Sequence, residues 1–552
     1  MYLYLKTSEV VWILTIILTV LLFVVVYILD LRFLKILAIN KSLMQINDEE
    51  IAYLKGELSA FNDGNQFIDH DHNYSFDLDI FGTGSIYQAL NRTVSKEGEV
   101  TLANWLLKTD VSENEIIDKQ NAVKTLSGLI DFRQMFRAYG MQNELDFKTL
   151  AKQFETKKLP VNKTHLMICY LIVAVTLLVA ALTIFGFMGY HLLVLLFFGQ
   201  ILLAGMKSKM TQSRYNKLDG FYKSMKVYDD LLKHIKLNEE LLKSEYLNSL
   251  ITVLISGNNS ASEAFTELKK LLSRFDQRGN LLIAVLTNGF LLSDLFLNIR
   301  YQKWINRFID EIDRYINAFG EFEALLCLSN FSYNHPDFCY PVLSNKELIS
   351  GKKLGHPLID ANTRVCNDYE VSSQKSYSLV TGANMAGKST FLRTVGINLV
   401  LASCGCTVCA KEFLFRPMVL FSSMRTSDNL VNQISYFQAE LLRLKKLIDV
   451  IKNHQITFII LDEILKGTNS KDKLAGSRLF LKSLLNYNAS GIVATHDLAL
   501  GELATELPNH FNNICFEISI DGDDISYDYK LQEGIAKNMN ATYLINRILS
   551  VD

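Results

Sequence analysis

The sequence has few of the residues that build flexible linkers, with only 6 prolines and 28 glycines among 552 residues. It also lacks a dominant charge, because 56 lysine and arginine residues nearly balance 58 acidic residues and leave a net charge of −2. The low content of proline and glycine excludes long low-complexity linkers. The balanced charge neither requires nor excludes nucleic acid, since a local basic face is enough for binding. At roughly 150 residues per unit, the length predicts three or four structural units.

The eight cysteines are scattered, and their spacing lacks the second ligand pair of a zinc site. The one cluster consists of Cys404, Cys406 and Cys409, in an apolar segment that follows a helical pattern. Metal binding is the alternative here, but we expect these small side chains to pack in a core. Free thiols fit a reducing, cytosolic setting for the soluble part of the chain.

Three long runs contain no charged residue: Val10–Leu29, Leu166–Phe185 and His191–Met206. Runs of about 20 apolar residues span a bilayer, so we predict one N-terminal span and a transmembrane hairpin. The alternatives are a cleaved signal peptide for the first run and a buried soluble hairpin for the other two. No small-residue cleavage site follows the first run, which disfavours the signal peptide.

Basic residues flank these runs on one predicted side. The positive-inside rule then places the short N-terminus outside and the remainder in the cytoplasm. We therefore expect a multi-pass protein of the inner or plasma membrane, with all its chemistry cytoplasmic. The flanking residues are Arg32, Lys35 and Lys41 after the first run, Lys157, Lys158 and Lys163 before the hairpin, and Lys207 and Lys209 after it.

The remaining residues before His335 mostly follow a helical period. Gly82–Gly84 predicts a turn, Gly98 predicts a break, and Tyr301–Cys327 predicts one amphipathic helix. A basic stretch with interleaved aromatic residues follows the third apolar run. It fits phosphate binding, a basic collar facing anionic lipid or a solvated helix face, and we favour the last two. Its members are Arg214, Lys217, Lys223, Lys226, Lys233 and Lys236.

The stretch Tyr377–Leu401 reads YSLVTGANMAGKSTFLRTVGINLVL. A short apolar strand pattern leads into a glycine-bounded loop with the spacing G-x-x-x-x-G-K-S, and a helical pattern follows. Such glycines let backbone N–H groups turn toward phosphate oxygens, and the helix N-terminus favours the same anion. Lys388 would reach the outer phosphates and Ser389 would hold Mg²⁺. A chance match is disfavoured by the strand and helix on either side.

From His335 onward, short apolar strands alternate with helices, which predicts an α/β domain. The strand pattern Thr457–Leu461 ends at Asp462 and Glu463. A carboxylate at this strand end would hold Mg²⁺, and the adjacent Glu463 would orient and deprotonate water.

Another predicted strand, Ile492–Thr495, ends at His496. A histidine at a strand end of a nucleotide-binding fold is placed to sense the outer phosphate, although a structural role is the alternative. The runs Ile514–Ile520 and Ile525–Leu531 predict a closing hairpin across Asp521-Gly522.

Thr381–Gly396 (TGANMAGKSTFLRTVG) resembles the ATPase motif of the MutS family of DNA mismatch-repair proteins. The Asn-Met-Ala between the glycines is more specific than a generic P-loop. The similarity covers roughly residues 75–160 and 210–545. Its other elements are His356–Ile359, Asn367-Asp368, Ser427-Asp428, Ser435–Glu440, Leu461–Thr468 and Ala494–Asp497, with looser matches at Phe81–Leu107, Ile117–Val123 and Glu321–Phe331.

The resemblance implies an α/β P-loop NTPase of the ABC type at the C-terminus, after an all-α core and lever interrupted by transmembrane helices. It implies ATP hydrolysis in a homodimer, with each nucleotide between the P-loop of one subunit and the signature segment of the other. Catalysis would use Glu463, His496 and Lys388, and Mg²⁺ would bind Ser389 and Asp462. Ser435 would contact the partner's γ-phosphate. The implied ATP-binding residues are Gly382, Ala383, Asn384, Met385, Ala386, Gly387, Lys388, Ser389, Thr390, Asn367 and Asp368.

The sequence also departs from the family pattern. Ala383 replaces the usual proline, and Lys473 stands where the family often has glycine. We expect no mismatch-recognition domain. The expected segments are an N-terminal transmembrane helix (1–30), a spacer (31–74), a first helical core part (75–164), a transmembrane hairpin (165–206), a second core and lever part (207–334) and the ATPase domain (335–552).

Two functions remain open. One is a membrane-anchored ATPase that handles duplex, mismatched or branched DNA through its levers and clamp. The alternative is a membrane mechanochemical ATPase with no DNA role, which acts on the transmembrane helices or on a membrane partner. A basic inner surface on the dimer would favour the first. The hairpin placed within the helical core favours the second.

Overall fold

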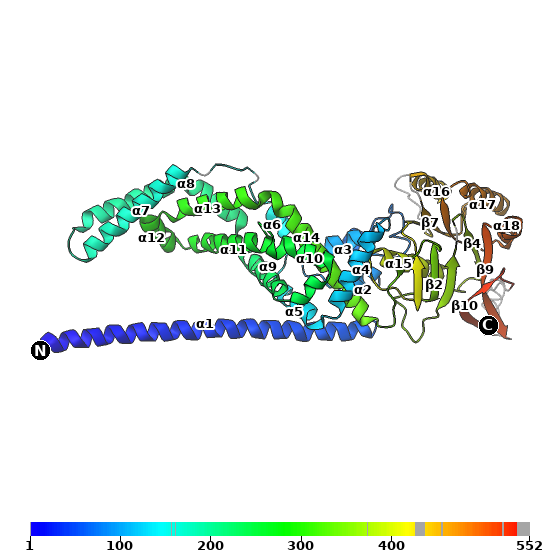
Figure 1. The fold of residues 1–552 in the computed structure, drawn as a ribbon, viewed down its shortest axis with the longest axis horizontal. Coiled ribbons are helices and arrows are strands. Elements are labelled where there is room, and N and C mark those ends of the chain that lie inside the picture. Colours follow the sequence, from blue (N-terminus) through cyan, green and yellow to red (C-terminus); the bar gives the residue numbers. More distant parts are fainter. Residues whose placement is uncertain are drawn as a thin grey trace, which may run out of the picture. The chain divides into compact units, whose positions relative to one another are not determined.

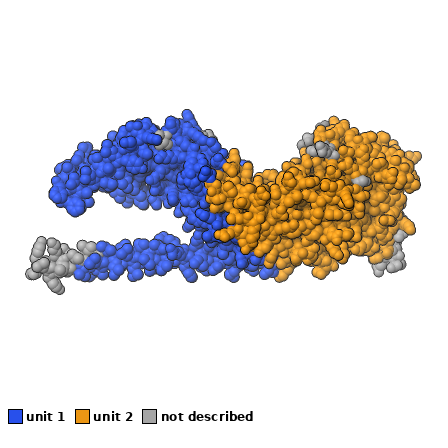
Figure 2. Space-filling view, viewed as in Figure 1, with its two compact units in different colours: residues 1–52, 130–238, 258–312 blue, residues 53–129, 239–257, 313–552 orange. Residues whose placement is uncertain are grey.

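The computed structural model describes residues 2–155, 157–160, 162–372, 374–425, 436–453, 456–521 and 524–537. The chain divides into two compact units, each built from separate stretches of sequence (Figure 2). Unit 1 comprises residues 1–52, 130–238 and 258–312, and unit 2 comprises residues 53–129, 239–257 and 313–552.

Unit 1 is helical. Asn162 begins α7 as its N-cap, because its side-chain oxygen accepts a hydrogen bond from the Thr164 N–H at 2.9 Å. A residue with positive φ, Leu292 at 49°, separates α12 from α13. The helices are α1 (Tyr2–Leu54), α5 (Ile130–Gly140), α6 (Phe147–Ala151), α7 (Lys163–Ile184), α8 (Tyr190–Leu218), α9 (Phe221–Lys236), α11 (Ala261–Arg278), α12 (Leu281–Leu291) and α13 (Ser293–Phe308) (Figure 1).

Several of these helices are strongly apolar. Among the described residues, Leu14–Leu54 and Lys163–Ile184 are long and apolar enough to cross a membrane, by length and composition only. The third predicted run, His191–Met206, lies in α8, and this helix bends by 63° between Met206 and Lys209 before it continues to Leu218. A second bent pair, which the sequence did not predict, joins α12 at 86° to the helix that begins at Ser293. If each bent pair is one span, these residues hold up to four spans.

Helices α7 and α8 form a hairpin through the glycine-containing connection after Ile184 (Figure 1). Inside it, the Gln200 amide donates a hydrogen bond to the Thr176 hydroxyl at 2.5 Å, and both side chains are buried. Polar pairs of this kind hold apolar helices together where water is absent.

Some basic residues in the stretch after the hairpin form ion pairs and hydrogen bonds within the protein. Arg214 is only 3% exposed, and its guanidinium donates to Glu155 at 3.0 and 2.8 Å and to Asn298 at 2.6 Å. Lys233 lies 2.6 Å from Asp229. Arg214 is therefore a core residue and belongs neither to a lipid-facing collar nor to a phosphate site.

The prediction of one helix over Tyr301–Cys327 is wrong. Helix α13 ends at Phe308, a 3₁₀ turn covers Ile309–Glu311, and α14 (Ile312–Asn334) begins after it. A 3₁₀ turn keeps residues i and i+3 on one face, so the apolar pattern continues through the tightened backbone and hides the break.

The helical part of unit 2 surrounds α14. Gly98, predicted as a break, instead lies in the first turn of α3, where the Ser95 hydroxyl caps its N–H at 3.1 Å. A Cβ at this position would lie 1.9 Å from a carboxylate oxygen of Glu323 on α14. The glycine therefore permits close helix packing. The elements are α2 (Ile86–Leu90), α3 (Lys96–Leu106), α4 (Glu113–Ser127), α10 (Glu245–Ile251) and α14.

The C-terminal part of unit 2 is an α/β domain, as predicted. Its six-stranded sheet has the order β10-β9-β4-β8-β7-β6, with every pair parallel except β9 and β10. The predicted closing hairpin is present, and residues 522–523 at its turn lie outside the described part. The strands are β4 (Tyr377–Gly382), β6 (Val419–Ser423), β7 (Thr457–Asp462), β8 (Ala489–Ala494), β9 (Phe511–Asp521) and β10 (Asp524–Glu533).

Helices flank this sheet, and a second, four-stranded sheet has the order β1-β5-β2-β3. Gly396 in α15 lies directly on the core, because a Cβ there would approach Leu78 to 2.7 Å and Ile460 to 3.1 Å. Cys404, Cys406 and Cys409 are buried after α15, in agreement with the predicted packing role. The elements are β1 (Val342–Leu343), β2 (Ile349–Leu354), β3 (Asn367–Val371), β5 (Glu412–Phe415), α15 (Lys388–Ser403), α16 (Tyr436–Asn453), α17 (Ser470–Leu484) and α18 (Glu502–Glu506).

Candidate functional site

A cavity of about 720 Å³ lies where β4, β7 and β8 end and α15 begins. Parallel sheets bind ligands at the carboxyl ends of their strands, because loops and helix N-termini meet there. The cavity collects predicted site residues from three separate segments: Asn384, Met385, Gly387, Lys388, Ser389 and Thr390 from the P-loop, Asp462 and Glu463 from the end of β7, and His496 after β8, together with Asn367.

The backbone of the P-loop requires its glycines. Gly382 has φ 154° and Gly387 has φ 103°, and Met385 between them also has a positive φ of 66°. A Cβ on Gly382 would lie 2.8 Å from the Phe516 carbonyl oxygen, and one on Gly387 would lie 3.0 Å from the Tyr529 ring. Gly387 is also the N-cap of α15, so the first backbone N–H groups of that helix face the loop.

Lys388 is held inside the loop. Its Nζ donates hydrogen bonds to the carbonyl oxygens of Gly382 at 2.7 Å and Ala383 at 2.8 Å, and the residue is 6% exposed. Burial lowers the pKa of Lys388 below its usual value, whereas the carboxylates of Asp462 and Glu463 act in the opposite direction. A buried ammonium beside converging N–H groups is suited to bind an anion.

The structure brings Ser389 and Asp462 together although they are far apart in sequence. The Ser389 hydroxyl donates a hydrogen bond to Asp462 Oδ2 at 2.7 Å. A hydroxyl beside a carboxylate is an oxygen donor set of the kind that Mg²⁺ prefers. These two residues therefore fit the predicted metal role.

Glu463 stands at the centre of a small charged group. Its Oε1 lies 3.2 Å from His496 Nε2 and its Oε2 lies 3.7 Å from Lys473 Nζ. Its backbone has a φ of 55°, and its N–H donates to the Ala494 carbonyl at 2.9 Å. Burial, reinforced by Lys388, lowers the pKa of His496, whereas the carboxylates of Glu463 and Asp462 act in the opposite direction.

Lys473, the position that departs from the family pattern, therefore contacts Glu463. A second acidic residue, Glu440 on α16, organises the loop after β7. Its two carboxylate oxygens accept hydrogen bonds from the N–H groups of Lys466 at 3.0 Å and Gly467 at 3.1 Å. Sequence similarity had marked the segment that contains Glu440 without indicating this role.

The structure places Asn367 and Asp368 differently. Asn367 lines the cavity and ties β3 to β10, since its side chain donates to the Tyr529 carbonyl at 3.0 Å and accepts from the Leu531 N–H at 2.9 Å. Asp368 instead accepts a hydrogen bond from the Lys353 N–H at 2.7 Å. The predicted signature residue Ser435 and the Ser427-Asp428 pair lie outside the described residues.

Sequence reasoning missed one side of the cavity. Apolar and aromatic side chains from β2, the segment after it, α15, β9 and β10 line that side. Among them, His356 is mostly buried, and desolvation together with Arg393 and Arg364 lowers its pKa to about 4. His356, Ile359 and Phe391 belong to segments that the resemblance had marked, but it assigned them no place in the site, and the other positions come from separate segments without a motif. They are Leu354, His356, Ile359, Thr363, Val365, Phe391, Phe516 and Tyr529.

Comparison with known proteins identifies this domain. Residues 378–546 match the family model of MutS domain V. A DNA mismatch repair protein MSH4 from Arabidopsis thaliana is 30% identical over 249 residues, which are 43% of this chain and 31% of that protein. A DNA mismatch repair protein MutS from Ehrlichia ruminantium (strain Gardel) is 29% identical over 266 residues, covering 47% and 31%. The chain thus spans about a third of the length of these curated relatives.

Proposed function

Because the chain belongs to the MutS family through its C-terminal domain, we propose that it is a Mg²⁺-dependent ATPase anchored in a membrane. The strongest support is that residues from three separate sequence motifs line one cavity. The P-loop, the Ser389–Asp462 pair and the Glu463–His496 pair all line it.

Each residue then has a role that its contacts allow. Lys388 and the N–H groups at the start of α15 bind the phosphates of ATP. Glu463 accepts a proton from the attacking water, and His496 holds that carboxylate in place at 3.2 Å. Ser389 and Asp462 hold Mg²⁺, which would neutralise phosphate charge when bound. Lys473 gives Glu463 a second contact, at 3.7 Å.

The family resemblance supports a homodimer as the active form. In that arrangement Ser435 would complete the ATP site of the partner subunit. Opening and closing of the dimer would transmit the hydrolysis cycle to the helical parts of the chain. The apolar helices α1, α7 and α8 support membrane anchoring by length and composition. Their basic flanks support a cytoplasmic ATPase domain.

Two uses of this ATPase are distinguishable. The relatives are DNA mismatch repair proteins, which supports a DNA substrate such as duplex, mismatched or branched DNA. The alternative is mechanical work on the membrane helices or on a membrane partner. It is supported by the apolar α7–α8 hairpin, which lies in unit 1 among helices that resemble the family core.

The decisive measurement is the ATPase rate of the full-length protein in detergent, alone and with homoduplex, mismatched or branched DNA at near-physiological salt. Low salt would inflate non-specific DNA binding. Stimulation that depends on DNA structure would support the DNA function, and a robust rate indifferent to all DNA would support the membrane function. A Lys388→Ala preparation is the control for contaminating ATPases. A wild-type rate no higher than this control would overturn the proposed activity.

A further inference from the structure

Unit 1 contains a second cavity, of about 370 Å³, beside the candidate span α7. Its walls come from α7, the end of α11, α12 and the start of α13. One part is apolar and includes Tyr170, Val173 and Phe296, with the Tyr170 and Phe296 rings 4.9 Å apart. Another part carries Arg274, Arg278 and Arg300. The cavity therefore joins an apolar wall to a cluster of cations.

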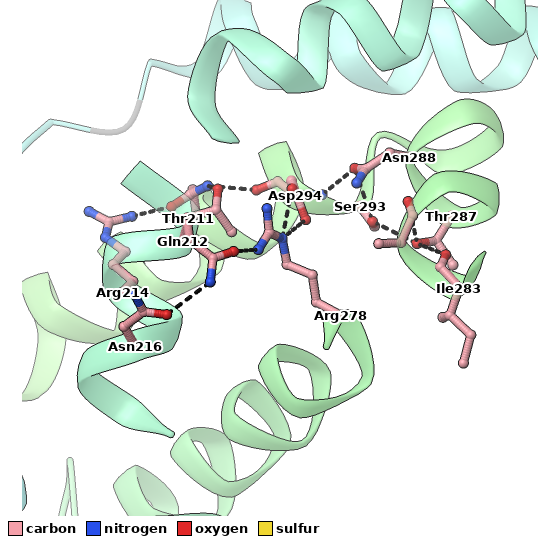
Figure 3. A network of polar contacts seen from close by, with 12 residues as sticks. Thr211, Gln212, Arg214, Asn216, Arg278, Ile283, Thr287, Asn288, Ser293 and Asp294 are labelled. Carbon is pink, nitrogen blue, oxygen red and sulfur yellow. Dashed lines mark hydrogen bonds and ion pairs between the residues drawn. The ribbon is translucent and has the colours of Figure 1, made fainter. Parts of the chain in front are cut away.

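A partly buried network of polar contacts holds Arg278 in place (Figure 3). Arg278 Nε donates to both carboxylate oxygens of Asp294, at 3.0 and 2.9 Å, and its Nη1 donates to Gln212 at 2.6 Å. Asp294 is only 3% exposed, and its own N–H donates to Asn288 Oδ1 at 2.9 Å. The Ser293 hydroxyl donates to the same Asn288 oxygen at 3.1 Å. Arg278 is thus neutralised and held in place from within the protein.

The other two arginines are different. Arg274 and Arg300 are exposed, and within the described part of the chain neither forms an ion pair or a side-chain hydrogen bond. Among the described residues that line the cavity, Asp294 is the one carboxylate and it pairs with Arg278, so the charges of Arg274 and Arg300 have no partner in that lining. Guanidinium groups bind phosphate oxygens through paired N–H donors, which gives both charge and geometric complementarity.

We propose that this cavity binds one anionic phospholipid, whose phosphate contacts Arg274 and Arg300 and whose chain lies against Tyr170, Val173 and Phe296. The assignment rests on the membrane anchoring in the proposed function. Tyr170 lies about two turns into α7, where aromatic residues of membrane helices face the lipid headgroups. Basic pockets beside membrane helices on the cytoplasmic side bind anionic headgroups for the same reasons.

The test uses the full-length protein in non-ionic detergent, titrated with phosphatidylglycerol or with phosphatidylcholine of the same acyl chains. Native mass spectrometry counts the bound lipids. We expect one phosphatidylglycerol site in the wild type and a roughly 30-fold weaker affinity in Arg274→Gln/Arg300→Gln. The matched control is Lys270→Gln/Lys303→Gln, which removes the same charge from exposed positions of α11 and α13 that do not line the cavity. This control should bind phosphatidylglycerol like the wild type.

Equal affinity for the two lipids, or an equal loss in the control, would overturn the proposal. Displacement of the lipid by millimolar inorganic phosphate would assign the arginines to a free anion and would also overturn it. The ATPase rate and the resistance of the protein to alkaline extraction from membranes are measured on the same preparations. An active, membrane-embedded protein without lipid selectivity would refute this inference alone. An inactive or extractable protein would refute the proposed function.

Discussion

Replacing Glu463 with glutamine tests the central chemical assignment. Glutamine has nearly the same shape and keeps one oxygen, which can replace the carboxylate oxygen that faces His496 at 3.2 Å or the one that faces Lys473 at 3.7 Å. It should therefore preserve the loop and the binding of ATP. It cannot accept a proton from water, so only the chemical step should suffer.

The size of the effect follows from the surroundings of Glu463. A positioned general base contributes about 10²–10⁴ in rate, or about 3–5 kcal/mol of activation free energy. The neighbouring carboxylate of Asp462 is not a ready substitute, because it accepts the Ser389 hydroxyl at 2.7 Å. We expect Glu463→Gln to fall within this range of loss in kcat.

The assay is steady-state phosphate release together with the equilibrium binding of a fluorescent ATP analogue. ATP binding should stay within about threefold of the wild type, since the phosphate-binding residues are untouched. Glu502→Gln is the matched control, because Glu502 contacts Arg478 on α17 at 3.2 Å, is well exposed and does not line the cavity. Turnover of Glu463→Gln near the wild-type rate would remove Glu463 from the role of general base.

Two further predictions concern stability. Burial, assisted by Glu97, raises the pKa of Glu323 to about 8, so the native carboxyl keeps a proton that the unfolded chain releases near pH 4.5. The free energy of unfolding, measured by denaturant titration, should therefore fall as pH rises from about 4.5 to 8. The Glu323→Gln variant should lose this pH dependence, and an unchanged dependence in the variant would refute the assignment. Arg214→Met should destabilise unit 1 by about 2–3 kcal/mol, because it removes charge-assisted hydrogen bonds to the partly exposed Glu155 and to Asn298. Arg307→Met, which breaks a half-exposed pair with Glu263, should cost less than about 1 kcal/mol in the same thermal melts, and equal losses would contradict the burial argument.

The sequence was sufficient for the features that depend on neighbours along the chain. The P-loop is a continuous strand, loop and helix, so its glycines, Lys388 and Ser389 are readable from their spacing. Asp462 ends the buried strand β7 and His496 follows the buried strand β8, and parallel strands bring their ends to one edge of a sheet. The apolar length of α7 was likewise local information.

Other features required the tertiary structure. Three of them join residues from separate elements. Lys473 contacts Glu463, and Glu440 supports the loop at Lys466 and Gly467. His356 belongs to the apolar side of the cavity. The same holds for Gly98. Its spacing predicted a helix break, whereas in the structure it makes room for the Glu323 side chain.

The physical reason is that spacing along a chain determines which side chains share a strand end or a helix face, but not what packs against them. Apolar periodicity predicted helices in unit 1, yet it could not show that Arg278 and Asp294 would meet at 2.9 Å in a cavity that Arg274 and Arg300 also line. That arrangement depends on how α11, α12 and α13 pack. The proposed ATP site could therefore be predicted largely from the sequence, whereas the proposed lipid site depends on the tertiary structure.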